Sequence, residues 1–111
     1  MKPTLNAKGI YINCKQIEVD GTDCKAIIRV ANCEYGYRAV CNYKSKGCLN
    51  QMPVTQFVEP VTTEREAIAS AIECRLHDII DYHGVTERKE IVVLLWNLLQ
   101  EYNQLELFEE L

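Results

Sequence analysis

The chain has 111 residues, of which 48% are hydrophobic and 25% charged, with a formal net charge of −4. This length predicts one domain with one modest core. No stretch reaches the roughly 18 apolar residues that a membrane helix needs, which argues against membrane association. The first residues form no apolar run, so we expect no secretion signal and a cytoplasmic location.

The charge is divided unevenly along the chain. Residues 1–58 carry eight Lys/Arg and four Asp/Glu, whereas residues 59–111 carry four and twelve. Such asymmetry favours two surfaces with different partners. Ordinary solvated surface is the alternative explanation.

The cysteines are numerous for a chain of this length, but their spacing includes no Cys-x-x-Cys pair of the kind used in zinc and redox sites. In the absence of a secretion signal we expect reduced thiols, and a disulfide framework is the alternative. The six are Cys14, Cys24, Cys33, Cys41, Cys48 and Cys74.

Alternating apolar residues predict strands over 10–14 and 16–19, with a bulge or strand break near Lys15, where the apolar phase slips by one. Asp20-Gly21 predicts a hairpin with a two-residue type I′ turn. Further strands are expected over 24–30 and 37–43, with a turn at 44–47. The stretch 48–58 is more weakly extended, and Pro53 restricts it to an edge or a loop.

Two helices are predicted in the second half of the chain. Thr63-Glu-Arg-Glu66 is typical of a capping box and predicts a helix over about 64–82. Gly84 favours a left-handed stop, and Thr86 would cap a second helix over about 87–102. The first helix should bury Ile68, Ala69, Ile72, Leu76, Ile79 and Ile80.

This order of elements predicts an α+β fold, with a three- to four-stranded antiparallel sheet followed by two helices packed on one face. The domain should span residues 1–103, with residues 104–111 as a peptide tail. The sheet followed by Thr63-x-x-Glu66-Ala67-Ile68-x-x-Ala71 resembles HicB-like antitoxin domains, which implies a small regulatory or toxin-binding protein.

The end of the second helix breaks its own apolar pattern. Leu107, Phe108 and Leu111 fall away from the stripe that the earlier residues form, and exposed apolar clusters usually mark contact surfaces. The stripe consists of Ile91, Leu94, Leu95, Leu98, Leu99 and Tyr102.

The segment Gln104-Leu-Glu-Leu-Phe108 resembles the Gln-Leu-x-Leu-Phe motif that binds the bacterial sliding clamp. The resemblance implies that Gln104 is a polar anchor, that Leu105 supports the approach, and that Leu107 and Phe108 fill an apolar pocket of the clamp. Glu106 departs from the usual Ser or Asp. The alternative is a last helical turn that packs on its own domain or on a second copy of the chain.

A basic group on neighbouring strands is interleaved with Tyr35, Tyr37 and Tyr43, a combination that can hold nucleic acid by phosphate contacts and stacking. Alternation places Tyr37 and Tyr43 on the face opposite Arg38, which favours packing roles for these two. The basic group consists of Lys25, Arg29, Arg38, Lys44 and Lys46.

Enzymatic chemistry has little support. Cys74, His77, Asp78 and Asp81 share one helix face, but a solvated polar face explains them. We assign no catalytic residue, metal ligand or cofactor.

The patterns therefore predict a non-enzymatic bacterial or phage protein that docks on the replicative sliding clamp, where it recruits or obstructs other clamp partners. The alternative is a phage-encoded inhibitor or regulatory adaptor that acts on a defence-system protein through its acidic helices or its sheet face. A homodimer is compatible with both.

Overall fold

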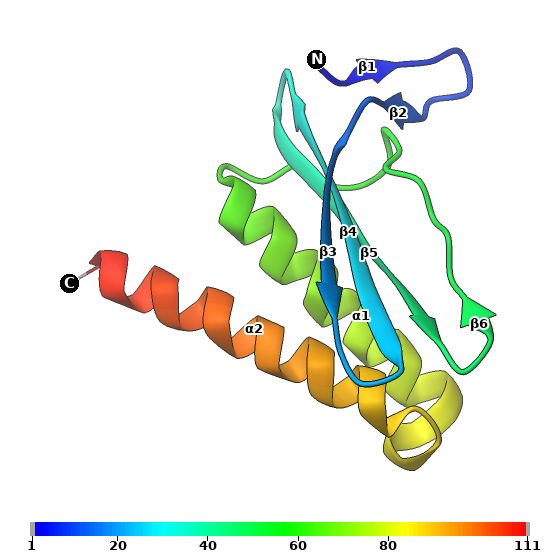
Figure 1. Cartoon of the computed structure of the whole chain (residues 1–111). Helices are drawn as coiled ribbons and strands as arrows, with labels where there is room; N and C mark the ends of the chain where they lie inside the picture. The colour runs from blue at the N-terminus through cyan, green and yellow to red at the C-terminus, as the bar shows by residue number, and fades with distance from the viewer. Residues whose placement is uncertain (1, 111) are drawn as a thin grey trace.

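A four-stranded antiparallel sheet forms the centre of the molecule, in the order β3-β4-β5-β6 (Figure 1). Its strands are β3 (Lys15–Asp20), β4 (Cys24–Cys33), β5 (Gly36–Ser45) and β6 (Cys48–Leu49). The structure is a computed structural model that describes the backbone of residues 2–110 and their side chains, except those of 85–87 and 104–110. Two helices cover one face of the sheet, so the predicted α+β class is confirmed.

A separate two-stranded ribbon precedes the sheet. It consists of β1 (Thr4–Leu5) and β2 (Tyr11–Ile12). Asn13 has a φ of 60° and therefore ends the extended run between β2 and β3. The phase slip predicted near Lys15 is thus a strand break, and the two halves belong to different sheets.

The hairpin between β3 and β4 is present, but its turn lies later than predicted. The Gly21 amide donates to the Cys24 carbonyl at 2.9 Å, and the left-handed residue is Asp23, with a φ of 58°. The predicted type I′ turn at Asp20-Gly21 is therefore wrong. Gly21 is needed for space instead, since a Cβ there would lie 2.7 Å from Cys24 Sγ and 3.2 Å from Leu94 Cδ2.

The β5–β6 hairpin has the turn that the β3–β4 hairpin lacks. Lys46 and Gly47 have φ values of 48° and 77°, and they connect the paired residues Ser45 and Cys48. Two consecutive left-handed residues are what a type I′ turn requires. The turn predicted over 44–47 is confirmed, and it directs β6 back along β5.

Helix α1 (Glu64–Glu87) begins where the sequence predicts. Thr63 is extended, and its Oγ1 accepts a hydrogen bond from the Glu66 amide at 3.1 Å. Gly84 departs from helical geometry with a φ of 75°, as its predicted stop role requires. The helix resumes after this kink and continues to Glu87.

Helix α2 (Lys89–Glu110) differs from the prediction at both ends. Thr86 lies within the last turn of α1, so it does not cap α2. At its other end, α2 continues past Tyr102 to Glu110. Neither Gly nor Pro occurs between Ile91 and Glu110, so nothing in the sequence interrupts the backbone hydrogen bonds of the helix.

The core lies between the two central strands and the two helices. Alternation along β4 points its even-numbered residues toward the helices, and β5 contributes Ala39, Cys41 and Tyr43. The predicted α1 face is confirmed, with four of its residues buried and Ala69 and Ile80 packed against the core. The fully buried or nearly fully buried members are Ala26, Ile28, Val30, Ile68, Ile72, Leu76, Ile79, Ile91 and Leu95.

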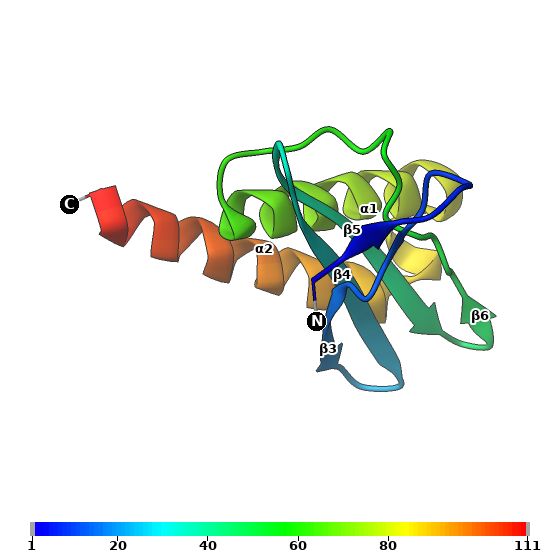
Figure 2. The same ribbon diagram turned by 90° about the horizontal axis from the view of Figure 1, so that it is seen from above.

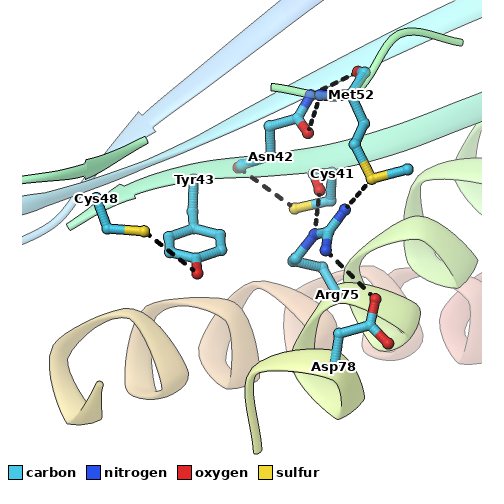
Figure 3. Close-up of polar contacts among 7 residues, drawn as sticks. All are labelled: Cys41, Asn42, Tyr43, Cys48, Met52, Arg75 and Asp78. Carbon is cyan, nitrogen blue, oxygen red and sulfur yellow. Dashed lines mark hydrogen bonds and ion pairs between the residues drawn. The ribbon is translucent and has the colours of Figure 1, made fainter. Parts of the chain in front are cut away.

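The segment between β6 and α1 closes the outer edge of β5, which would otherwise expose unpaired backbone groups. Asn42 donates through Nδ2 to the Met52 carbonyl at 2.9 Å and accepts from the Met52 amide at 2.8 Å (Figure 3). Arg75 of α1 donates to the Cys41 carbonyl at 2.8 Å and to Met52 Sδ at 3.0 Å. Tyr37 and Val61 exchange two backbone hydrogen bonds further along the strand.

All six cysteines lie among the described residues and are free thiols, as predicted. Cys24 and Cys41 are buried, where they act as small apolar residues, and Cys74 is exposed on α1. Burial raises the pKa of Cys41 to about 12 and also raises the pKa of Cys24. These two thiols therefore hold very little thiolate at neutral pH.

The substitution Thr63→Ala should destabilise the protein by about 1 kcal/mol, because it removes the acceptor for a first-turn amide of α1. Chemical denaturation would measure the change in unfolding free energy, with Thr62→Ala as the matched control. An unchanged midpoint for Thr63→Ala would contradict the capping role.

Alkylation of the native protein at neutral pH should modify Cys74 first and Cys41 last, since only thiolate reacts and burial suppresses it at Cys41. Timed labelling followed by peptide mass mapping would give the order. In unfolded, non-reduced protein all six should react, and a missing pair of thiols or rapid native labelling of Cys41 would contradict the account.

Candidate functional site

The C-terminal end of α2 projects beyond the sheet and beyond the start of α1 (Figures 1 and 2). Among the described residues, the last α2 side chain packed against the core is Tyr102. Glu101 and Asn103, on either side of it, are exposed. The buried residues of α2 all precede this point: Ile91, Val92, Leu95, Leu98 and Leu99.

The predicted partner-binding residues Gln104, Leu105, Leu107 and Phe108 occupy this projecting part of α2. Their side chains lie outside the described residues. The backbone there is helical, although Leu107 and Phe108 fall away from the apolar stripe of the sequence. A helix needs neighbouring residues that tolerate helical φ/ψ, and it does not need each turn to contact a core.

The outer face of α2 carries two large apolar side chains in water. Val93 is 46% exposed and Trp96 is 54% exposed, one turn apart. A groove of about 660 Å³ borders Val93, between the N-terminal half of α2 and the tips of the β3–β4 and β5–β6 hairpins. Its walls include Gly21, Thr22, Lys46, Lys89 and Leu94. Sequence reasoning missed this groove, because the two hairpin tips are far from α2 in the chain.

A small charged cluster fixes one wall of this groove. The Ser45 hydroxyl donates to Glu90 Oε1, and Lys46 Nζ lies 3.6 Å from Glu90 Oε2. The pKa of Glu90 is lowered, mainly by the hydrogen bond from Ser45. The nearby Lys46 ammonium lowers this pKa further. Glu90 is therefore ionised at neutral pH, and it ties the start of α2 to the β5–β6 turn.

The five predicted basic residues do not form one basic surface. Lys25, Arg29 and Lys44 share the sheet face opposite the helices, where Lys25 lies directly across from Lys44. Acidic residues of β3 lie among these basic side chains. Lys25 Nζ is 3.8 Å from Glu18 and 3.7 Å from Asp20. Lys46 lies at the groove beside α2. The open face therefore carries mixed charge, which weakens long-range attraction of phosphates.

Arg38 belongs to the packing of the sheet and is only 8% exposed. Its Nε donates to the Val58 carbonyl and its Nη1 to the Tyr11 hydroxyl, each at 2.8 Å. The guanidinium also lies 5.6 Å from the centre of the Tyr11 ring. Tyr37 and Tyr43 face the helices, as alternation predicts, and Tyr43 is buried in the core.

A polar cavity of about 610 Å³ opens where β3 meets α1. Lys15 Nζ and Glu64 Oε1 form an ion pair of 2.8 Å in its wall, so the two charges neutralise each other. Cys14 also lines the cavity, and burial raises the pKa of its thiol, which works against a nucleophilic role. Asn13 and Asn32 supply amides that could hold a small polar molecule.

The polar face of α1 is engaged in local pairs. His77 Nε2 lies 3.9 Å from Glu73, and Asp78 accepts from Arg75 at 3.3 Å. Within the described residues, no group of three or more His, Cys, Asp or Glu side chains is arranged to hold a metal ion.

No described helix is long and apolar enough to cross a membrane. No protein-family model, curated protein or solved structure matches this chain. The candidate sites are therefore defined by the chain's own geometry: the projecting end of α2, the groove beside Val93, the mixed-charge sheet face and the cavity beside Lys15.

Proposed function

We propose that this protein is a non-enzymatic adaptor of bacterial or phage type that docks on a replicative sliding clamp through Gln104–Phe108. The observation that supports this proposal most is the position of the segment. The sequence Gln-Leu-Glu-Leu-Phe lies on the part of α2 that projects beyond the folded body, after the last described residue packed against the core.

Binding would require the segment to leave the helix, because the resemblance implies an extended peptide in the clamp. The last turns of a helix open at low cost, since the opening free energies of proteins are smallest at fraying ends. Tyr102 would remain packed against the core. The body would then stay folded while the peptide changes conformation.

The favourable term is the transfer of Leu107 and Phe108 from water into an apolar pocket, about 1.5–3 kcal/mol each. Ordering the peptide offsets part of that gain. We therefore expect a dissociation constant on the order of micromolar unless the body adds contacts. At this affinity the protein would recruit a second partner to the clamp, or obstruct other clamp-binding proteins when it is abundant.

A second candidate is a phage-encoded inhibitor or regulatory adaptor that binds a basic partner through α1. The feature in its favour is a row of exposed carboxylates on that helix: Glu66, Glu73, Asp78 and Asp81. Asp78 already pairs with Arg75, and Glu73 lies near His77, which reduces the charge available to a partner. Binding by this route would survive loss of the C-terminal segment.

The double substitution Leu107→Ala with Phe108→Ala should abolish clamp binding and leave the melting temperature nearly unchanged, because the described core ends at Tyr102. Calorimetry with a purified bacterial clamp would measure binding, and thermal denaturation would measure stability. The matched control is Glu109→Ala with Glu110→Ala, which alters the same helix end outside the motif and should keep binding within a few fold.

Two results would overturn the proposal. One is the absence of binding heat from the unmodified protein at micromolar concentrations. The other is unfolding of the double variant several degrees earlier, which would make the segment structural. Capture of a partner by a chain without residues 104–111 would favour the second candidate.

A further inference from the structure

We propose that the outer face of α2 binds a second copy of this chain, with the two α2 helices antiparallel. The first observation is the exposed pair Val93 and Trp96, at 46% and 54% exposure on one side of the helix. A half-exposed tryptophan beside a half-exposed valine leaves apolar area in water that a partner could bury. This face is therefore a candidate contact surface, and the remaining observations indicate its occupant.

A groove adjoins this face on the side of Val93. It has a volume of about 660 Å³ and runs along Val93, Leu94 and Asn97. The β3–β4 hairpin forms its far wall, where Gly21 leaves room for the Leu94 side chain, since a Cβ at Gly21 would lie 3.2 Å from Leu94 Cδ2. The wall is preformed, so binding would order little of the body.

The charges of the groove select an acidic occupant with apolar residues. Lys46 and Lys89 stand at its edge, and Glu90 is the one carboxylate among the described residues of its wall. Glu90 accepts from Ser45 and pairs with Lys46, so Lys89 supplies the net positive charge of the groove. Residues 104–110 contain three Glu and no Lys or Arg, together with Leu107 and Phe108. Complementary charge would orient this segment toward Lys89 while these two apolar residues meet Val93 and Trp96.

The occupant must come from another molecule. A helix rises about 1.5 Å per residue, so position 107 lies about 21 Å along α2 from position 93 of the same chain. The segment cannot fold back onto its own groove while α2 is helical. In a dimer with a two-fold axis near Gln100, position 107 of each copy lies beside position 93 of the other.

The spacing of the sequence agrees with this arrangement. Positions 93, 96, 100, 104 and 107 are separated by three or four residues, so a continuous helix carries them on one side. The apolar residues stand at the two ends of this row, and Gln100 and Gln104 stand in its middle. An antiparallel pair therefore places the C-terminal end of each α2 beside the N-terminal half of the other. Apolar residues then meet apolar residues, and the acidic end meets Lys89.

One consequence rests on the proposed function. A dimer of this kind would cover Gln104–Phe108, so the clamp and the second copy would compete for one segment. The self-association itself needs no clamp and is tested without one.

Trp96 is the single tryptophan of the chain, so its fluorescence reports this surface alone. Raising the concentration of the unmodified protein should shift its emission to the blue in parallel with a change from monomer to dimer in sedimentation velocity. Lys89→Glu should weaken association at least tenfold, and adding Glu110→Lys to that variant should restore it. The controls are Lys44→Glu and Phe57→Ala, which change an exposed lysine and an 85% exposed aromatic elsewhere.

Thermal denaturation of each variant shows whether it remains folded. A chain that stays monomeric at about 500 µM would overturn the proposal, since even weak specific pairing is visible at that concentration. A dimer that persists after both Lys89→Glu and removal of residues 104–111 would also overturn it, because another surface would then be responsible. Clamp titration of the monomeric Lys89→Glu variant tests the proposed function separately.

Discussion

The apolar layer between the two central strands and the two helices is the constraint on which the other features depend. Ile28 of β4, Ile72 and Ile79 of α1, and Ile91 and Leu95 of α2 have almost no exposed surface. Together these five side chains contribute on the order of 10 kcal/mol of apolar burial, taken against an extended chain. Their contacts fix the strand register, because a slip of one residue along β4 would turn its apolar face to water.

This layer also determines where α2 ends its contact with the body. The helix crosses the sheet, and its last described contact with the core is Tyr102, whereas its backbone continues to Glu110. The body thus presents a helical segment outward, and on the same helix it leaves Val93 and Trp96 uncovered. Both proposals are built on this arrangement, one on the segment after Tyr102 and the other on Val93 and Trp96.

Sequence periodicity predicted the parts of the fold that one local repeat determines. Alternation along β4 and β5, the cap at Thr63 and the interruption at Gly84 depend on neighbouring residues only. The extent of α2 was predicted wrongly, because an apolar stripe measures contact with a core and not helicity. The turn at Gly21 was also misplaced. A Cβ at Gly21 would lie 2.7 Å from Cys24 Sγ and 3.2 Å from Leu94 Cδ2, and the second of these contacts comes from a residue far along the chain.

The candidate sites were harder to predict, because most of them depend on contacts between residues distant in sequence. Arg38 is a residue type that often contacts nucleic acid. Here it donates hydrogen bonds to Tyr11 and Val58, which are distant in sequence, and it is therefore part of the packing. Lys25 meets Glu18 and Asp20 only because β3 pairs beside it. The groove beside Val93 requires two hairpin tips and a helix to meet. Of the predicted sites, the five-residue segment at the end of α2 is the one that depends on local sequence alone.

The central claim is that this segment is where the protein meets its partner. Hydrogen–deuterium exchange, measured with and without a purified bacterial clamp at a concentration where the protein is monomeric, tests it most directly. The account predicts that the clamp slows exchange in residues 104–108 and leaves the amides of β4, β5 and α1 unchanged. Unchanged exchange in this segment, or protection confined to α1 or the sheet, would contradict it.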